Sequence, residues 1–292
     1  MKVLITGANG QLGWELKRTA PKWSSIHALT RGELNILDAS QIERCLREFR
    51  PDLIINAAAY TAVDRAEGEP DQAYAVNALG PRNLARAAAA ADLRVVHIST
   101  DFVFSGSQPT PYLPSDTAEP LSTYGASKLE GEHAILSIAG GRSLVVRTSW
   151  LYSVHGRNFV KTVLGAAERR STINIVADQI GTPTWARGLA EAIWEMAASP
   201  ILSGVYHWTD AGIASWYDFA VAVLDYSSAL GLMKQRVTIV PVRTNDYPLV
   251  AKRPAMSVLD KTVTWNVLKR IPLHWRQALK QMLNELAQTK RR

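Results

Sequence analysis

Short apolar runs alternate with amphipathic segments through the first half of the chain. Five runs predict buried β-strands, at residues 3–5, 26–29, 53–55, 95–98 and 144–146. The segments between them predict helices near residues 11–20, 38–50, 71–92 and 125–138. This alternation predicts an α/β fold on a doubly wound parallel sheet of the Rossmann type, whose strands are apolar because helices cover both faces. From the usual connectivity we expect the fourth strand to lie beside the first.

The pattern changes after about residue 150. It predicts a strand at residues 173–176 and helices near residues 185–198, 214–230 and 274–289, with prolines interrupting the segments between them. We interpret residues 1–150 as a dinucleotide-binding domain and residues 151–292 mainly as a smaller C-terminal substrate-binding lobe. One or two of the later elements are expected to return to the main sheet.

Composition narrows the class of protein. Hydrophobic residues make up 47% of the 292 residues and charged residues 20%, which predicts a globular protein with a sizeable core. The single cysteine, Cys45, cannot form a disulfide within the chain, and we interpret it as a small core residue in a reducing compartment. No apolar run approaches the ~20 residues that span a bilayer, and the N-terminus lacks a signal-peptide pattern. We expect a cytoplasmic protein with no membrane contact.

The chain is basic, with a net charge of +7. Such a charge suits anionic small molecules and nucleic acid alike. The positive residues are scattered except for Lys290, Arg291 and Arg292, which we interpret as a solvated tail, and no nucleic-acid-binding motif accompanies them. We therefore expect no nucleic-acid partner.

Residues 6–13 (TGANGQLG) form a glycine-rich turn between the first predicted strand and the first predicted helix. In this context Gly7 permits the tight turn, Gly10 lets the backbone approach a pyrophosphate, and Gly13 lets the helix pack close to the strand. The N-terminus of the helix offers free N–H groups and a partial positive charge to phosphates. The spacing is Gly-x-x-Gly-x-x-Gly, and its flanking elements favour a dinucleotide site over a turn without a ligand.

The end of the second predicted strand bears on the choice of cofactor. NAD-binding proteins favour an acid there, whereas a 2′-phosphate favours arginine. Residues 28–31 (ALTR) contain no acid, and Arg31 is the nearest charge. We expect NADPH, with NADH as the alternative if Arg31 is simply a solvated side chain.

Tyr124 and Lys128 lie four residues apart at the start of a predicted helix and therefore share one face. A free tyrosine has a pKa of about 10, and an adjacent ammonium lowers it, which suits proton exchange near neutral pH. Lysine can also bind the nicotinamide ribose. Thr100, with Ser99 as the fallback, ends the fourth predicted strand, where a hydroxyl can hydrogen-bond a substrate carbonyl. Thr100, Tyr124 and Lys128 together predict hydride transfer to or from a carbonyl.

Further segments extend this pattern along the chain. They are residues 56–64 (NAAAYTAVD), 99–104 (STDFVF), 147–152 (RTSWLY) and 178–184 (DQIGTPT), followed by Arg253-Pro254 with residues 257–260. Together with the glycine turn and the tyrosine–lysine pair, they resemble the dTDP-4-dehydrorhamnose reductases of the extended short-chain dehydrogenase/reductase superfamily over nearly the whole chain. The resemblance implies reduction of the C4 keto group of dTDP-4-dehydro-L-rhamnose to dTDP-L-rhamnose, a precursor of lipopolysaccharide and cell-wall polysaccharide.

The resemblance also implies roles for individual residues. Gln11 and Leu12 join Gly7, Gly10 and Gly13 around the cofactor pyrophosphate. The other implied cofactor contacts are Arg31, Asn35 and Ile36 on the adenosine side, Ala57, Ala58 and Ala59 beside the nicotinamide, and Tyr124 and Lys128. The implied substrate contacts are Thr100, Asp101, Trp150, Asn158, Gln179 and Arg253. Trp150 is expected to stack on the apolar face of the deoxysugar. Asn35 departs from the family, which often has an acidic residue there.

Some members of the family bind magnesium through glutamates at a dimer interface. Glu15 and Glu191 match those positions, and Glu285 is a loose third. Glutamates on helix surfaces are usually only solvated, so we assign no metal, and a homodimer stays an alternative to a monomer.

The same residues are also compatible with other functions. A sugar-nucleotide dehydratase of this superfamily carries Asp-Glu after the threonine, whereas Asp101 and Phe102 follow Thr100 here. A non-catalytic NADP-binding regulatory subunit, similar to that of methionine adenosyltransferase, would keep the glycine turn and the tyrosine–lysine pair. Another reductase that modifies sugar nucleotides is the third alternative. The segments around Trp150 and Gln179 favour the dTDP-sugar reductase.

Overall fold

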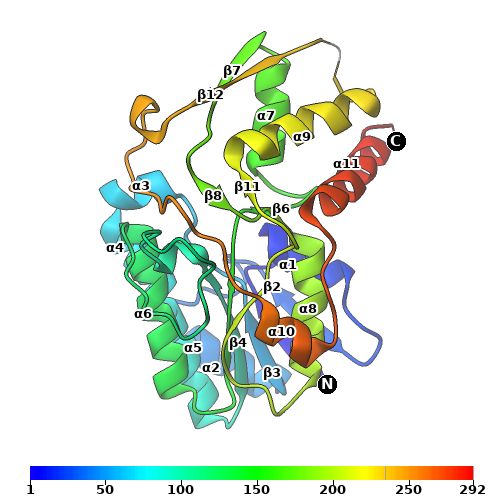
Figure 1. Cartoon of the computed structure of the whole chain (residues 1–292). Helices are drawn as coiled ribbons and strands as arrows, with labels where there is room; N and C mark the ends of the chain where they lie inside the picture. Colours follow the sequence, from blue (N-terminus) through cyan, green and yellow to red (C-terminus); the bar gives the residue numbers. More distant parts are fainter. Residues whose placement is uncertain (234, 292) are drawn as a thin grey trace.

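Six parallel strands form the central sheet, in the order β10-β5-β4-β3-β1-β2 (Figure 1). They are β1 (Lys2–Thr6), β2 (Ser25–Leu29), β3 (Leu53–Asn56), β4 (Arg94–Thr100), β5 (Leu144–Thr148) and β10 (Gly204–His207). The computed structural model describes residues 1–233 and 235–291, with side chains as far as residue 289, so the predicted tail of Lys290, Arg291 and Arg292 lies outside the described side chains. The five strands predicted in the first half are all present, and the predicted α/β fold with a parallel sheet is confirmed.

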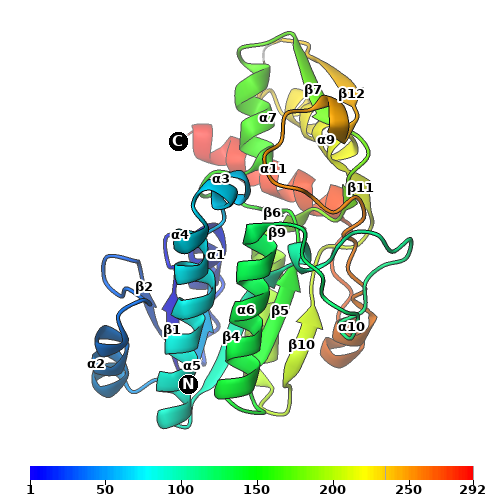
Figure 2. The same cartoon turned by 90° about the vertical axis from the view of Figure 1, so that its left-hand side faces the viewer.

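Helices cover both faces of this sheet (Figures 1 and 2). The helical elements are α1 (Gln11–Arg18), α2 (Ala39–Phe49), α3 (Val63–Gly68), α4 (Pro70–Tyr74), η1 (Ala75–Leu79), α5 (Gly80–Ala90), η2 (Asp101–Val103), α6 (Thr123–Ile138), α7 (Phe159–Ala167), α8 (Ala186–Ala198), α9 (Trp216–Ala229), η3 (Thr244–Asp246), α10 (Thr262–Leu268) and α11 (Trp275–Arg291). Apolar residues of α2, α5 and α6 bury one face, and those of α1 and α8 bury the other. Cys45 packs half-buried against the first of these two cores.

Two expectations about the sheet were wrong. The fourth strand, β4, lies between β3 and β5 and does not pair with β1. Residues 30–38 form turns where a further strand was expected. The chain therefore returns through α2, and β3 takes the place beside β1. β2 is not fully buried, because it is an edge strand with a single neighbour. Its apolar run predicted the strand correctly but not its position in the sheet.

The helix predicted at residues 71–92 is divided into three parts. α4 passes into a π-helical turn, η1, before α5 continues to Ala90. The sequence Gly80-Pro81 lies where α5 begins, and proline is well suited to the first turn of a helix. Single π-helical turns inside helices are often found at functional sites, and the side chain of Asn77 in η1 reaches the proposed active site, as described below.

The C-terminal half builds a lobe above the carboxyl ends of the strands and also returns to the sheet (Figure 1). The smaller strands pair as β6 (Leu151–Tyr152) with β9 (Thr184–Trp185), β7 (Thr172–Val176) with β12 (Thr238–Val242), and β8 (Ile180–Gly181) with β11 (Ala214–Ser215). α7, α9 and α11 share a core with Tyr152 and Trp275. β10 pairs with β5, and α8 packs on α1, so two later elements complete the nucleotide-binding layers.

Among the described residues, no helix has both the length and the apolar character needed to cross a membrane.

Candidate active site

The glycine turn closes tightly against the strand beside it. Gly7 has a φ of 74°, and a Cβ atom there would lie 2.6 Å from the backbone nitrogen of Ala58. A Cβ on Gly13 would lie 2.2 Å from the carbonyl oxygen of Gly7, so only glycine lets α1 begin so close to β1. These distances agree with the predictions that Gly7 permits a tight turn and that Gly13 lets the helix pack close to the strand.

The N-terminus of α1 is free to bind an anion. Gly10 precedes the helix, and no side chain caps its first backbone N–H groups, which belong to Gln11, Leu12 and Gly13. Four such N–H groups at a helix start lack a partner within the helix, and the helix dipole adds partial positive charge there. The turn therefore fits the pyrophosphate of a dinucleotide.

A cleft of about 260 Å³ continues from this turn. Its lining includes the predicted cofactor residues Gly7, Gly10, Arg31, Asn35, Ile36, Ala57, Ala58 and Ala59. Six further lining residues were not predicted: Asn9, Leu34, Leu37, Tyr60, Gln72 and Val76. Apolar walls with a few polar groups are typical of nucleotide sites, and the cleft fits the adenosine part of the cofactor.

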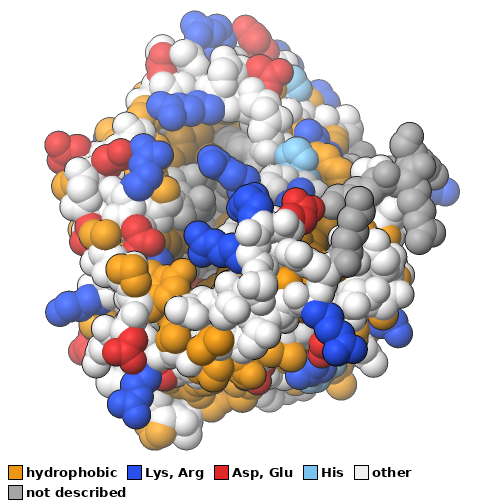
Figure 3. All heavy atoms as spheres, turned by 90° about the horizontal axis from the view of Figure 1, so that it is seen from above, with side chains coloured by type: hydrophobic (Ala, Val, Ile, Leu, Met, Phe, Trp, Pro, Cys, Tyr) orange, Lys and Arg blue, Asp and Glu red, His pale blue; other side chains and the backbone are white. Residues whose placement is uncertain are grey.

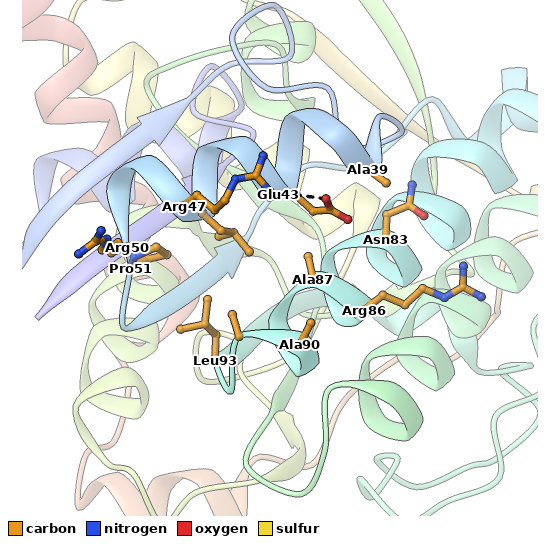
Figure 4. Close-up of a pocket in the computed structure, with 12 residues that line it drawn as sticks. Ala39, Glu43, Arg47, Arg50, Pro51, Asn83, Arg86, Ala87, Ala90 and Leu93 are labelled. Atoms are coloured by element: carbon orange, nitrogen blue, oxygen red, sulfur yellow. Dashed lines mark ion pairs between the residues drawn. The ribbon is translucent and has the colours of Figure 1, made fainter.

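A second, larger hollow lies elsewhere. The groove between α2 and α5 has a volume of about 600 Å³ and is lined by alanines, Leu46, Leu93 and several arginines (Figure 4). Its polar groups include the exposed ion pair of Arg47 with Glu43, at 3.7 Å. It contains no candidate nucleophile or proton-transfer pair and lies apart from the glycine turn, so size alone does not identify the active site.

Tyr124 lies buried at the start of α6, beside the end of β4. Ser122 caps α6 by accepting a hydrogen bond from the backbone N–H of Gly125, at 3.2 Å, and so fixes the first turn that carries Tyr124. Burial raises the pKa of Tyr124 to about 12; the nearby Thr100 hydroxyl opposes that rise, and the Asp101 carboxylate adds to it. Burial therefore favours the protonated form of Tyr124.

Lys128 is 2% exposed, one turn further along α6. Its Nζ donates to the carbonyl oxygen of Ile98 at 2.6 Å, and burial lowers its pKa to about 8 despite the neighbouring Glu132 carboxylate. We expected the ammonium of Lys128 to lower the pKa of Tyr124. The pKa of Tyr124 is raised instead, because burial is the largest influence on the pKa of both side chains.

Asp101 is the third polar group of this cluster. Thr100 donates from its hydroxyl to Asp101 Oδ1 at 3.1 Å, while Oδ2 is buried without a partner among the described residues. Burial raises the pKa of Asp101 to about 7, and the nearby hydroxyls of Ser257 and Thr100 oppose that rise. A carboxyl group so placed can change its protonation near neutral pH.

Comparison with known proteins decides the family. The chain matches the family model "RmlD substrate binding domain" over residues 1–288. It is 43% identical to dTDP-4-dehydrorhamnose reductase of Burkholderia thailandensis, over 89% of this chain and 90% of the relative, and 40% identical to that of Aggregatibacter actinomycetemcomitans, over 96% and 97%. The chain belongs to the dTDP-4-dehydrorhamnose reductase family. The crystal structure of the Bacillus anthracis reductase in complex with NADP superposes with a TM-score of 0.91 at 36% identity, covering 97% of this chain and 99% of that one.

Members of this reductase family bind a nicotinamide dinucleotide and a nucleotide sugar, both polyanions. Seen from the side of the C-terminal lobe, lysine and arginine side chains gather around a hollow in this face of the molecule (Figure 3). Such a distribution of positive charge attracts anionic ligands.

The ring of Trp150, which was predicted to stack on the sugar, packs against a second tryptophan of the C-terminal lobe. Its ring stacks on Trp216 with centroids 3.5 Å apart, and a Cβ on Gly181 would lie 2.6 Å from an atom of the ring. Trp216 therefore covers one face of the ring, and stacking of Trp150 on the sugar stays a prediction. Trp150 has a φ of 45°, a strained value for a bulky residue and one that is typical of functional positions.

Asn158 and Gln179 both have partners within the protein. Asn158 caps α7, and its Nδ2 donates to Gln11 Oε1 at 2.9 Å and to the carbonyl oxygen of Ser153 at 2.7 Å. The structure thus places it beside the glycine turn and gives it a capping role instead of a free side chain for the sugar or diphosphate. Gln179 is buried and donates to the Thr244 hydroxyl at 3.1 Å.

Arg253 forms an ion pair that joins the two halves of the chain. Its guanidinium lies 2.8 Å from Asp64 Oδ2 at the start of α3 and is 17% exposed. This pair holds the loop after β3 against the C-terminal lobe. An incoming diphosphate would have to compete with Asp64 for the same guanidinium.

Two residues near Tyr124 and Lys128 were not predicted. Asn77 in η1 binds both backbone polar groups of Tyr60 and donates to Ser127 of α6 at 3.1 Å. His97 on β4 lies 3.4 Å from Lys128 Nζ. Both are polar residues inside apolar or alanine-rich segments, and this pattern in the sequence could have indicated them.

The candidate magnesium glutamates are held by arginines. Arg18 lies 3.4 Å from the buried Glu15 and 2.6 Å from Glu285, and Arg187 pairs with Glu191 at 3.3 Å. Within the described part of the chain, no group of three or more His, Cys, Asp or Glu side chains is placed to hold a metal ion.

Proposed function

We propose that this chain reduces the C4 keto group of dTDP-4-dehydro-L-rhamnose with NADPH and so produces dTDP-L-rhamnose. The observation that carries the proposal is the cluster of Thr100, Tyr124 and Lys128 beside an uncapped glycine turn, in a chain of the reductase family. The relatives named dTDP-4-dehydrorhamnose reductase support the substrate and favour it over the dehydratase and regulatory-subunit alternatives. The NADP complex of the Bacillus anthracis relative supports the cofactor.

The cofactor, when bound, supplies the hydride that reaches C4 of the sugar. Tyr124 donates its hydroxyl proton to the C4 carbonyl oxygen as negative charge develops there. Thr100 turns its hydroxyl from Asp101 Oδ1 towards the same oxygen and stabilises that charge. Lys128 orients the nicotinamide ribose, and the N–H groups at the start of α1 bind the pyrophosphate.

Arg31 and the C-terminal lobe contribute to recognition. Arg31 lines the adenosine cleft, which supports the proposal that it binds a 2′-phosphate and favours NADPH over NADH. Asp101 and the edge of Trp150 contact the sugar, and Gln179 and Arg253 lie on the diphosphate side. We also propose that residues 1–150, completed by α8 and β10, bind the cofactor, whereas the rest of residues 151–292 bind the nucleotide sugar. A homodimer stays a prediction.

Turnover with the keto sugar tests the function directly. The measurement is the loss of reduced-nicotinamide absorbance with dTDP-4-dehydro-L-rhamnose generated in situ, with NADPH and NADH in parallel. We expect oxidation that depends on the keto sugar and is faster with NADPH. Tight NADPH binding without such turnover would contradict the proposal and favour a regulatory role.

A further inference from the structure

The start of α6, which carries Tyr124, is bound by a side chain of another helix. Thr123 is the first residue of α6, and its backbone N–H and its hydroxyl both donate to the carboxylate of Glu67 on α3, each at 2.9 Å. The two residues are 56 positions apart in the sequence. The first N–H groups of a helix lack partners within the helix, and helix ends fray, so Glu67 holds a turn that would otherwise be loosely fixed.

Glu67 completes a cap that Ser122 begins. Ser122 accepts from the backbone N–H of Gly125 at 3.2 Å, which satisfies a second N–H group of the same turn. Ser122 directly precedes the helix and moves with it, whereas Glu67 fixes the turn relative to α3. A carboxylate at this place is also attracted by the partial positive charge of the helix N-terminus. The two contacts bind Thr123 and Gly125, the residues on either side of Tyr124.

α3 is itself held to the C-terminal lobe and gives Glu67 a fixed base. Asp64, in the first turn of α3, accepts from the backbone N–H of Ala251 at 3.1 Å and pairs with Arg253 at 2.8 Å. Asp64 and Glu67 are three residues apart and are therefore neighbours on the helix surface. α3 thus joins a loop of the lobe to the start of α6.

α3 also packs near the ring of Tyr124. Tyr124 shares a small apolar cluster with Ala66 of α3 and Ala73 of α4, and Val63 of α3 packs against this cluster. Phe102 meets the ring edge-on, with centroids 5.6 Å apart. Apolar contacts are not directional, so they confine the ring without fixing its distance from a reacting atom. Directional contacts to the backbone, such as those of Glu67, are needed for that.

We propose that Glu67 is a positioning residue for Tyr124: by binding both polar groups of Thr123, it sets where α6 begins and hence where the Tyr124 hydroxyl lies. The inference rests on the proposed reductase function, in which Tyr124 donates a proton to the C4 carbonyl oxygen. The hydroxyl is at the far end of a rigid ring, so a small rotation of the helix start moves it further than the backbone. A displacement of about 1 Å at a reacting group can lower the rate by about 10²-fold.

Two substitutions of Glu67 separate its hold on Thr123 from its charge. Glu67→Ala removes both acceptors, and we expect kcat with the keto sugar to fall by about 10–10²-fold while the KM for NADPH is unchanged. Glu67→Gln should restore most of the turnover. Its amide oxygen accepts from the Thr123 N–H, and its NH₂ group donates to the Thr123 hydroxyl, which can rotate to accept.

Asp260→Ala is the matched control. Asp260 accepts from the backbone N–H of Thr262 at 2.9 Å and from its hydroxyl at 3.3 Å, which is the same pair of contacts at the start of α10. α10 carries no candidate site residue, so this variant should lower the midpoint of denaturant unfolding and keep the wild-type kcat.

Two outcomes of this comparison would overturn the proposal. If Glu67→Ala lowers the unfolding midpoint as Asp260→Ala does but keeps the wild-type kcat, Glu67 only stabilises the fold. If Glu67→Gln is as slow as Glu67→Ala, the negative charge of Glu67 matters and its hold on Thr123 does not.

If Glu67→Ala does not fold, variants of Thr123 test the same contact from the other side. Thr123→Val keeps the backbone N–H and the branched shape but loses the hydroxyl, whereas Thr123→Ser keeps both donors. We expect Thr123→Val to lower kcat and Thr123→Ser to stay near the wild type. Equal turnover in the two variants would contradict a positioning role for this contact.

Amide hydrogen exchange across residues 122–126, measured without cofactor or sugar, reports on the helix start independently of turnover. We expect faster exchange in Glu67→Ala and wild-type exchange in Glu67→Gln. Unchanged exchange in Glu67→Ala would overturn the proposal whatever the activity of the enzyme. Failure of keto-sugar turnover in the wild type, with the difference in exchange intact, would contradict the reductase function and not the hold of Glu67 on α6.

Discussion

Asn158 Nδ2 lies 2.9 Å from Gln11 Oε1 and donates a hydrogen bond to it across the boundary between the C-terminal lobe and α1. Asn158 also caps α7 by accepting from the backbone N–H of Lys161 at 3.1 Å. One buried amide thus ties the first turn of the nucleotide-binding helix to the lobe above it.

We expect Asn158→Ala to lower the free energy of unfolding by about 1–2 kcal/mol, because the cap of α7 and the contact with Gln11 are both lost. The KM for NADPH should rise because Gln11 loses its restraint. Denaturant unfolding and steady-state kinetics measure the two effects. Asn174→Ala, at an exposed position of β7, is the matched control. A variant as stable as the control would contradict the capping role.

Removing the hydroxyl of Tyr124 should separate catalysis from binding. We expect Tyr124→Phe to lower kcat by roughly 10²–10⁴-fold, the usual contribution of a general acid, with little change in NADPH affinity. Steady-state turnover and fluorescence titration with NADPH measure these quantities. Tyr226→Phe, half-buried in the lobe core, controls for loss of a phenol elsewhere. Wild-type turnover in Tyr124→Phe would remove Tyr124 from the mechanism.

Arg31 should decide between the two nicotinamide cofactors. A charge-assisted contact to a 2′-phosphate contributes about 1.5–3 kcal/mol, so Arg31→Ala should raise the KM for NADPH by roughly tenfold or more and leave that for NADH nearly unchanged. The ratio of kcat/KM for the two cofactors is the measurement. Arg44→Ala, exposed on α2 and outside the adenosine cleft, is the control. An equal change for both cofactors would show that Arg31 does not bind a 2′-phosphate.

Asp101 should make the protein less stable as pH rises. Its pKa is raised from 3.8 to about 7 by burial, so between these pH values the folded state binds more protons than the unfolded state. The stabilisation is complete below about pH 4 and is lost as pH rises through about 7. Asp101→Asn should flatten this part of the profile of unfolding free energy against pH. Asp225→Asn, at an exposed position of α9, should keep the wild-type slope.

The packing of Trp150 gives a prediction for the substrate side. Gly181→Ala would place a methyl group 2.6 Å from the ring of Trp150, which is itself stacked on Trp216. We expect a loss of about 1–3 kcal/mol in stability and a higher KM for the sugar nucleotide, with the KM for NADPH unchanged. Gly165→Ala on α7 has room for a methyl group and serves as the control. An unchanged KM for the sugar would place Trp150 outside the substrate site.

The structural features that depend on a short segment alone, such as a strand or a turn, were predicted best from the sequence. The apolar runs located the five strands, and the glycine turn predicted its own geometry because Gly7 and Gly13 each meet backbone atoms that leave no room for a side chain. The order of the strands was beyond this reasoning. It depends on residues 30–38, which form turns although the connectivity expected from dinucleotide-binding folds has a strand there.

Features that join distant segments were also missed. The ring of Trp150 is covered by Trp216, 66 positions further along the chain, and no periodicity connects the two. β12 was not predicted because Pro241 stands inside its short apolar run, and proline argues against a strand at that position. His97 looked like an interruption of an apolar strand until the register of β3 and β4 placed it beside Asn56.

The return of β10 to the edge of the sheet has a consequence for how the chain is made. β5 lacks its outer neighbour, and α1 lacks α8, until residues 186–207 have been synthesised. The nucleotide-binding layers therefore cannot be completed on the ribosome when the first 150 residues emerge. A nascent chain arrested before residue 186 should remain open to proteases along β5, and one arrested after residue 207 has emerged should be protected.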